Sequence, residues 1–100
     1  MLSENVILYN TDGHPIYEND SKKLINRVEN LTIGDHCWLG MNSRILKGTF
    51  ISNGTIIGAD AVVTGKHFTE NCCLAGNPAK IVKENICWKR SDYNWIDNNV

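Results

Sequence analysis

The sequence has 100 residues, 42% hydrophobic and 21% charged, which suits one small domain and is too apolar for a disordered chain. Ten Lys and Arg against eleven Asp and Glu leave a net charge of −1, which provides no basic face for nucleic acid. The sequence contains neither the roughly 20-residue apolar run that crosses a bilayer nor a secretion signal, so we expect a cytoplasmic protein without a membrane span. Its four cysteines lack the spacing of zinc or redox motifs, and we expect reduced, structural thiols.

The first predicted element is an apolar strand at residues 5–10, "NVILYN", and a loop over residues 11–30 follows it. A six-residue pattern that governs residues 31–68 fails in this loop, because it would place Arg27 and Pro15 in a core. We therefore expect residues 11–30 to leave the regular structure. Loops that project from a rigid scaffold often carry binding and catalytic residues, and His14 stands in this one between Gly13 and Pro15.

Residues 31–68 place an aliphatic side chain at every sixth position. The positions are Ile33, Leu39, Ile45, Ile51, Ile57 and Val63. A helix would repeat its apolar residues every three or four positions, whereas six is a multiple of the strand period of two. Small residues follow four positions after most of these aliphatics and suit the inside of a tight bend. The pattern predicts a parallel β-helix, in which three hexads make one coil.

The register of this β-helix follows from the same count. The coils run from Ile33 to Phe50 and from Ile51 to Phe68, so each aliphatic stacks on the one eighteen residues later. The predicted stacks are Ile33 on Ile51, Leu39 on Ile57, and Ile45 on Val63. A β-sandwich is the competing prediction, but its turns vary in length and would not keep a six-residue register.

Two elements complete the single predicted domain, which covers residues 1–100. Residues 69–85 form a terminal turn and strand, and residues 86–100 form a tail without hexads. The tail carries two tryptophans and one tyrosine, and we expect it to fold back on the coil or onto a neighbouring chain.

These motifs together resemble the hexapeptide-repeat acyltransferases, above all the galactoside and maltose acetyltransferases and the polysaccharide O-acetyltransferases. The resemblance rests on the hexads, on "DGHP" at residues 12–15, "IGDHCWLG" at 33–40, "IGADAVVT" at 57–64 and "AGNPAKIV" at 75–82. It implies an all-β, left-handed parallel β-helix, acetyl-CoA as co-substrate, no metal, and a homotrimer that binds acetyl-CoA between neighbouring coils.

The resemblance also implies roles for single residues. His14 matches the histidine of the family's "GHP" loop and is the expected general base, because an imidazole can take the proton of a poorly nucleophilic sugar hydroxyl. Trp38 is expected to wall the acceptor and cofactor cleft. The residues expected to bind the coenzyme are Met41, Ala59, Thr64, Lys80 and Lys83. Two departures from the family pattern weaken the coenzyme assignment: Thr64 is followed by Gly65 instead of lysine, and Met41 replaces a common serine.

The function expected from this resemblance is acetyl transfer to a sugar hydroxyl, in the modification of a surface polysaccharide. Acetylation of an antibiotic or an amino sugar is the alternative within enzymes, and a non-catalytic β-helix module is the alternative outside them. The family has several coils ahead of the histidine loop, whereas Met1 precedes His14 by thirteen positions. The chain is therefore expected to be a short enzyme that relies on its trimer, or a fragment.

Overall fold

The computed structural model describes residues 1–90, and they form ten short strands. No helix among these residues is long and apolar enough to cross a membrane. The strands are β1 (Ile7–Leu8), β2 (Thr32–Ile33), β3 (Trp38–Leu39), β4 (Arg44–Ile45), β5 (Phe50–Ile51), β6 (Ile56–Ile57), β7 (Val62–Val63), β8 (Lys66–His67), β9 (Cys73–Gly76) and β10 (Ala79–Lys83).

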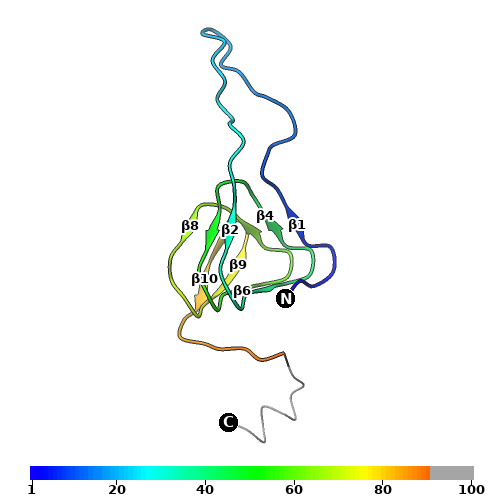
Figure 1. The fold of residues 1–100 in the computed structure, drawn as a ribbon, viewed down its shortest axis with the longest axis vertical. Coiled ribbons are helices and arrows are strands. Elements are labelled where there is room, and N and C mark those ends of the chain that lie inside the picture. Colours follow the sequence, from blue (N-terminus) through cyan, green and yellow to red (C-terminus); the bar gives the residue numbers. More distant parts are fainter. Residues whose placement is uncertain (91–100) are drawn as a thin grey trace, which may run out of the picture.

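The strands stack into three sheets that form the faces of a coil (Figure 1). Two sheets have three strands each, in the orders β1-β4-β7 and β2-β5-β8, and the third has the order β10-β9-β6-β3. Every pair of strands is parallel except β9 and β10. Parallel neighbours at this spacing confirm the predicted β-helix and rule out the β-sandwich.

The predicted stacks are confirmed residue by residue. Ile33 pairs with Ile51, Leu39 with Ile57, and Ile45 with Val63. The column of Leu39 and Ile57 continues in both directions, to Leu2 on one side and Leu74 on the other. Five of the six hexad aliphatics, from Leu39 to Val63, are at most 1% exposed and form the core, whereas Ile33 is half-buried.

Small residues fill the inside of the bends, as the sequence predicts. Ser43, Thr55 and Ala61 are completely buried. The two hydroxyls are satisfied locally: Ser43 Oγ donates to the carbonyl of Gly40 at 2.7 Å, and Thr55 Oγ1 donates to the carbonyl of Ser52 at 2.8 Å. The bends therefore bury polar side chains without leaving an unpaired hydroxyl.

A second six-residue period sets the backbone of the corners. The residue three positions after each of the first five hexad aliphatics has a positive φ, between 53° and 73°. These residues are His36, Asn42, Gly48, Gly54 and Asp60. Glycine, asparagine and aspartate are the residues that tolerate this left-handed conformation best. At Gly40 the constraint is different, because a Cβ would lie 2.5 Å from the carbonyl oxygen of Ile57 in the next coil.

The hexad count is wrong in one corner. The predicted coil ends at Phe68, so the partner of Ile51 was expected one residue after Phe68. Ile51 instead pairs with His67, two residues earlier. The shortcut lies at Thr64 and Gly65, where Gly65 has a φ of 82° and turns the chain within two residues. The coil that begins at Ile51 therefore closes early.

The segment after β10 folds back on the coil, as expected for the start of the tail. The Trp88 indole stacks on the His36 ring with centroids 4.0 Å apart. Two hydrogen bonds of 2.9 Å join the same residues, between His36 Nε2 and the Trp88 carbonyl and from Trp88 Nε1 to the His36 carbonyl. Residues 91–100, which hold the other tail aromatics, lie outside the described residues.

The four cysteines are free and differ in their surroundings. Cys37 and Cys72 lie in the core, Cys73 is half-buried and Cys87 is exposed. Burial raises the pKa of the Cys72 thiol and of the Cys73 thiol, which keeps both protonated at neutral pH. The predicted structural role fits the two core cysteines.

Ile57→Asp is expected to abolish cooperative unfolding, because it places an unpaired charge between Leu39 and Leu74. Asp60→Asn is the matched control: Asp60 is exposed and has a φ of 60°, which asparagine adopts readily. This control should change the free energy of unfolding by no more than about 0.5 kcal/mol. Thermal melting followed by circular dichroism measures both, and a cooperative melt for Ile57→Asp would contradict the register.

Candidate active site

The loop of residues 11–30 projects from the coil between β1 and β2 (Figure 1). Its base is closed by two hydrogen bonds, from the Glu29 amide to the Asn10 carbonyl at 3.1 Å and from the Gly48 amide to the Asn30 carbonyl at 3.2 Å. Its outer part is a short antiparallel hairpin in which Tyr17 bridges Leu24. The loop leaves the coil and has a hydrogen-bonded stem.

His14 lies on the outgoing arm of this loop, before the hairpin. The preceding Gly13 has a φ of 97°, and its amide donates to Thr11 Oγ1 at 3.2 Å. The His14 side chain is exposed, and its imidazole makes no hydrogen bond to another group within residues 1–90. Both ring nitrogens are therefore available to an incoming molecule.

A lysine of the coil binds both arms of the loop. Lys47, in the corner between β4 and β5, forms an ion pair with Asp12 at 2.8 Å and donates to the Arg27 carbonyl at 2.8 Å. The Lys47 ammonium and the Asn26 amide lower the pKa of the Asp12 carboxyl, which keeps the ion pair charged at neutral pH. The sequence reasoning missed Asn26 and Lys47, because no motif or spacing connects either residue with His14.

Two of the predicted coenzyme residues lie together on one corner of the coil. Met41 follows β3 and Ala59 follows β6, and the amide of the next residue, Asp60, donates to the Met41 carbonyl at 2.9 Å. Both side chains are exposed. They form a short ridge between the sheet that contains β3 and β6 and the sheet that contains β4 and β7.

The strand between Ala59 and Thr64 is a free sheet edge. Among the strands of residues 1–90, β7 is the last of the β1-β4-β7 sheet and pairs only with β4. Within residues 1–90, the amides of Ala59 and Thr64 donate to no other group. In the previous coil, by contrast, the Leu46 amide donates to the Val63 carbonyl at 3.0 Å. An extended molecule carrying carbonyl groups can therefore dock along this edge as an added strand does.

Lys80 and Lys83 lie on the same face of β10 because of a bulge. A spacing of three normally puts two strand residues on opposite faces. In β10 the register shifts between Ile81 and Lys83, so Lys80 pairs with Ala75 while Lys83 pairs with Cys73. Both ammonium groups are exposed, and the pair can present two positive charges to a polyanion.

The predicted site residues do not all meet within one chain. The loop with His14 leaves at the corner where Lys47 and Thr64 lie, whereas Met41 and Ala59 lie at the next corner, beyond β4 and β7. Trp38 is the first residue of β3, beside a third corner, where its Nε1 donates to Ser3 Oγ at 3.2 Å and its ring lies 5.9 Å from that of Trp88. Its role in the cleft stays a prediction, and its contacts suit a corner cap.

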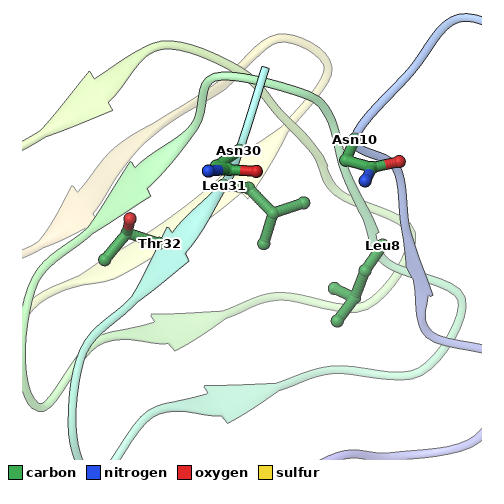
Figure 2. Close-up of a pocket in the computed structure, with 5 residues that line it drawn as sticks. All are labelled: Leu8, Asn10, Asn30, Leu31 and Thr32. Atoms are coloured by element: carbon green, nitrogen blue, oxygen red, sulfur yellow. The ribbon is translucent and has the colours of Figure 1, made fainter. Parts of the chain in front are cut away.

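A cavity of 570 Å³ opens at the base of the loop, where the two arms meet the coil. Figure 2 shows Leu8 and Leu31 on opposite sides of this opening and Asn10, Asn30 and Thr32 around it. Apolar side chains with nearby amides and a hydroxyl can hold a sugar ring and its hydroxyl groups. No group of three His, Cys, Asp or Glu side chains within residues 1–90 is arranged to hold a metal ion.

Curated proteins similar to this chain include O-acetyltransferases. The polysialic acid O-acetyltransferase of Escherichia coli O1:K1 / APEC is 45% identical over 92 residues, which are 92% of this chain and 30% of that protein. The enzyme of the same name from Neisseria meningitidis is 45% identical over 93% of this chain and 43% of its own length. The galactoside O-acetyltransferase of Escherichia coli K12 is 32% identical over 84% of this chain and 40% of its own length.

Solved structures that are similar to this chain also include acetyltransferases. The crystal structure of the polysialic acid O-acetyltransferase OatWY matches 97% of this chain and 47% of that chain, with 41% identity and a TM-score of 0.89. The structure of the polysialic acid specific acetyltransferase NeuO matches 88% of this chain and 37% of that chain, with 46% identity and a TM-score of 0.76. The structure of a galactoside acetyltransferase in complex with coenzyme A matches 83% of this chain and 44% of that chain, with 28% identity and a TM-score of 0.59.

No family model matches the sequence. The chain spans less than half the length of the relatives named above. Within that span the similarity covers the histidine loop and the coils and extends over most of the chain. By sequence and by fold, the chain is a homologue of the hexapeptide-repeat acetyltransferases and has their left-handed parallel β-helix.

Proposed function

We propose that this chain transfers the acetyl group of acetyl-CoA to a hydroxyl of a sugar, in the modification of a surface polysaccharide. The observation that carries the proposal is the imidazole of His14, which is exposed and has no hydrogen-bond partner among residues 1–90, on a loop held to the coil by Lys47. The similarity to polysialic acid O-acetyltransferases supports a polysaccharide acceptor.

In the proposed reaction His14 acts as general base. A nitrogen of its neutral imidazole accepts the proton of the sugar hydroxyl while the hydroxyl oxygen attacks the thioester carbonyl. The resulting tetrahedral intermediate collapses with cleavage of the carbon–sulfur bond, and the imidazolium returns its proton to the coenzyme A thiolate. The products are an O-acetylated sugar and free coenzyme A.

The free edge of β7 is the proposed binding place for the pantetheine arm of the coenzyme. The amide carbonyls of the pantetheine arm can accept hydrogen bonds from the amides of Ala59 and Thr64, which have no acceptor among the described residues 1–90, with Met41 beside them. Lys80 and Lys83, on one face of β10, provide the charge for the nucleotide phosphates.

We propose that the active enzyme is a cytoplasmic homotrimer. Within one chain the histidine loop and the Met41–Ala59 ridge lie at different corners, so a second copy is needed to bring His14 to that ridge. The loop also exposes a set of apolar side chains that a neighbouring copy would cover. They are Ile16, Tyr17, Leu24, Ile25 and Val28, each between 43% and 65% exposed.

The direct test is release of free thiol from acetyl-CoA, measured with polysialic acid, simple sugars, an amino sugar and an aminoglycoside as acceptors. Faster release with a polysaccharide supports the proposal. Preference for the amino sugar or the antibiotic would favour the alternative acceptors, and no release with any acceptor would favour a non-catalytic module.

His14→Ala should lower kcat by about 10² to 10⁴, the usual contribution of a positioned general base. The affinity for acetyl-CoA and the oligomeric state should stay unchanged, because His14 lies outside the coil. Asp20→Asn is the matched control, since Asp20 is an exposed loop residue and the change removes only its charge. An alanine variant that keeps half of the wild-type rate would refute the base assignment.

The chain should sediment as a trimer of about three times 11.2 kDa. Mixed subunits test whether sites are shared: His14→Ala chains keep the coil edge, and Ala59→Trp chains keep the base but block the edge. Random mixing of equal amounts should restore about a quarter of the sites, because one interface in four then combines two intact halves. A monodisperse monomer at micromolar concentration, or mixtures as inactive as their components, would contradict the shared site.

A further inference from the structure

Asn26 is the one residue of segment 9–30 that is partly shielded from solvent. It lies on the returning arm of the loop, opposite the arm that carries His14. Its side-chain amide uses both of its N–H groups, donating to Asp12 Oδ2 at 3.0 Å and to the His14 carbonyl at 2.8 Å. Its carbonyl oxygen accepts a hydrogen bond from the Ile16 amide. Each kind of hydrogen-bonding group in this amide is therefore engaged.

These three contacts bracket His14 in the sequence. They hold residues 12, 14 and 16, so the main chain is fixed before, at and after the histidine. The segment needs such support, because Gly13 has a φ of 97° and glycine has more accessible backbone conformations than any other residue. The imidazole itself makes no hydrogen bond, ion pair or ring contact within residues 1–90, so its position depends on its own main chain.

The three hydrogen bonds of Asn26 around His14 are connected to the rigid coil. Asp12, which accepts from Asn26, also pairs with Lys47 at 2.8 Å, and Lys47 donates to the carbonyl of Arg27, the residue after Asn26. The Lys47 side chain is only 20% exposed. Both arms of the loop are thus held relative to the coil through one lysine, and relative to each other through one asparagine.

We propose that Asn26 is a positioning residue that sets the location of the His14 imidazole by fixing the main chain on both sides of it. The inference rests on the proposed role of His14 as general base. A misplacement of about 1 Å in a reacting group costs up to about 10²-fold in rate, so a loop freed from Asn26 should lose turnover without losing the coenzyme edge on β7.

The test compares Asn26→Ala and Asn26→Asp with the control Asn19→Ala, which changes an exposed asparagine in the turn of the same hairpin. Asn26→Asp keeps the size of the side chain and the acceptor for Ile16, but it removes both donors and sets a carboxylate against Asp12. For each variant, kcat and KM for acetyl-CoA are measured beside the backbone ¹⁵N heteronuclear NOE of Gly13, His14 and Ile16.

Both Asn26 variants should lower kcat by about 10- to 100-fold, leave KM for acetyl-CoA and the melting temperature unchanged, and reduce the NOE at these three amides. Asn19→Ala should behave as wild type. The inference is overturned if kcat stays at the wild-type value, or if the three amides stay as ordered as in wild type. Failure of the proposed function looks different: His14→Ala then turns over as fast as wild type, or wild type itself releases no thiol.

Discussion

The stacking of one buried aliphatic side chain on its counterpart in the next coil is the interaction on which the rest of this structure depends. Leu39, Ile57 and Leu74 form one such column, and the backbone hydrogen bonds between coils follow the same register. A hexad contains one strand of two residues, which is too short to be stable alone. Each strand therefore persists only because the coils beside it bury its inward side chain and pair its backbone.

This dependence explains why the chain carries a long insertion without losing the fold. The insertion leaves after Leu8 and returns at Thr32, and both ends keep their partners in the next coil. Only the corner between these strands is replaced, so no column is interrupted. The inserted loop has no core of its own and is held by polar contacts, of which those of Lys47 and Asn26 join both arms. A rigid coil thus presents an ordered but largely exposed loop, as the proposed role of His14 requires.

The hexads were sufficient to predict the strands from β2 to β7 and the pairing among them, because burial and period fix the register of a parallel β-helix. They did not predict the partner of β5 in the following coil. The corners carried a further signal that the prediction did not use: Asn42, Gly48, Gly54 and Asp60 are six apart, and all tolerate a positive φ. Other features have no local signature. Three features depend on contacts between residues distant in sequence. They are the shortened corner at Gly65, the bulge that aligns Lys80 with Lys83, and the hydrogen bonds on both sides of His14. A single sequence contains the residues of these contacts but not their pairing.

Two of the three sheets end differently after their last parallel strand, and the difference bears on the proposed function. The sheet that contains β3, β6 and β9 is closed by the antiparallel strand β10, whose exposed lysines discourage further pairing. Within residues 1–90, the sheet that ends at β7 has no such cover, and the amides of Ala59 and Thr64 have no acceptor. An open strand edge invites unwanted association unless something occupies it. An extended coenzyme arm that binds along β7 would supply the missing acceptors, so the edge that the fold leaves open is also the edge that the proposed reaction needs.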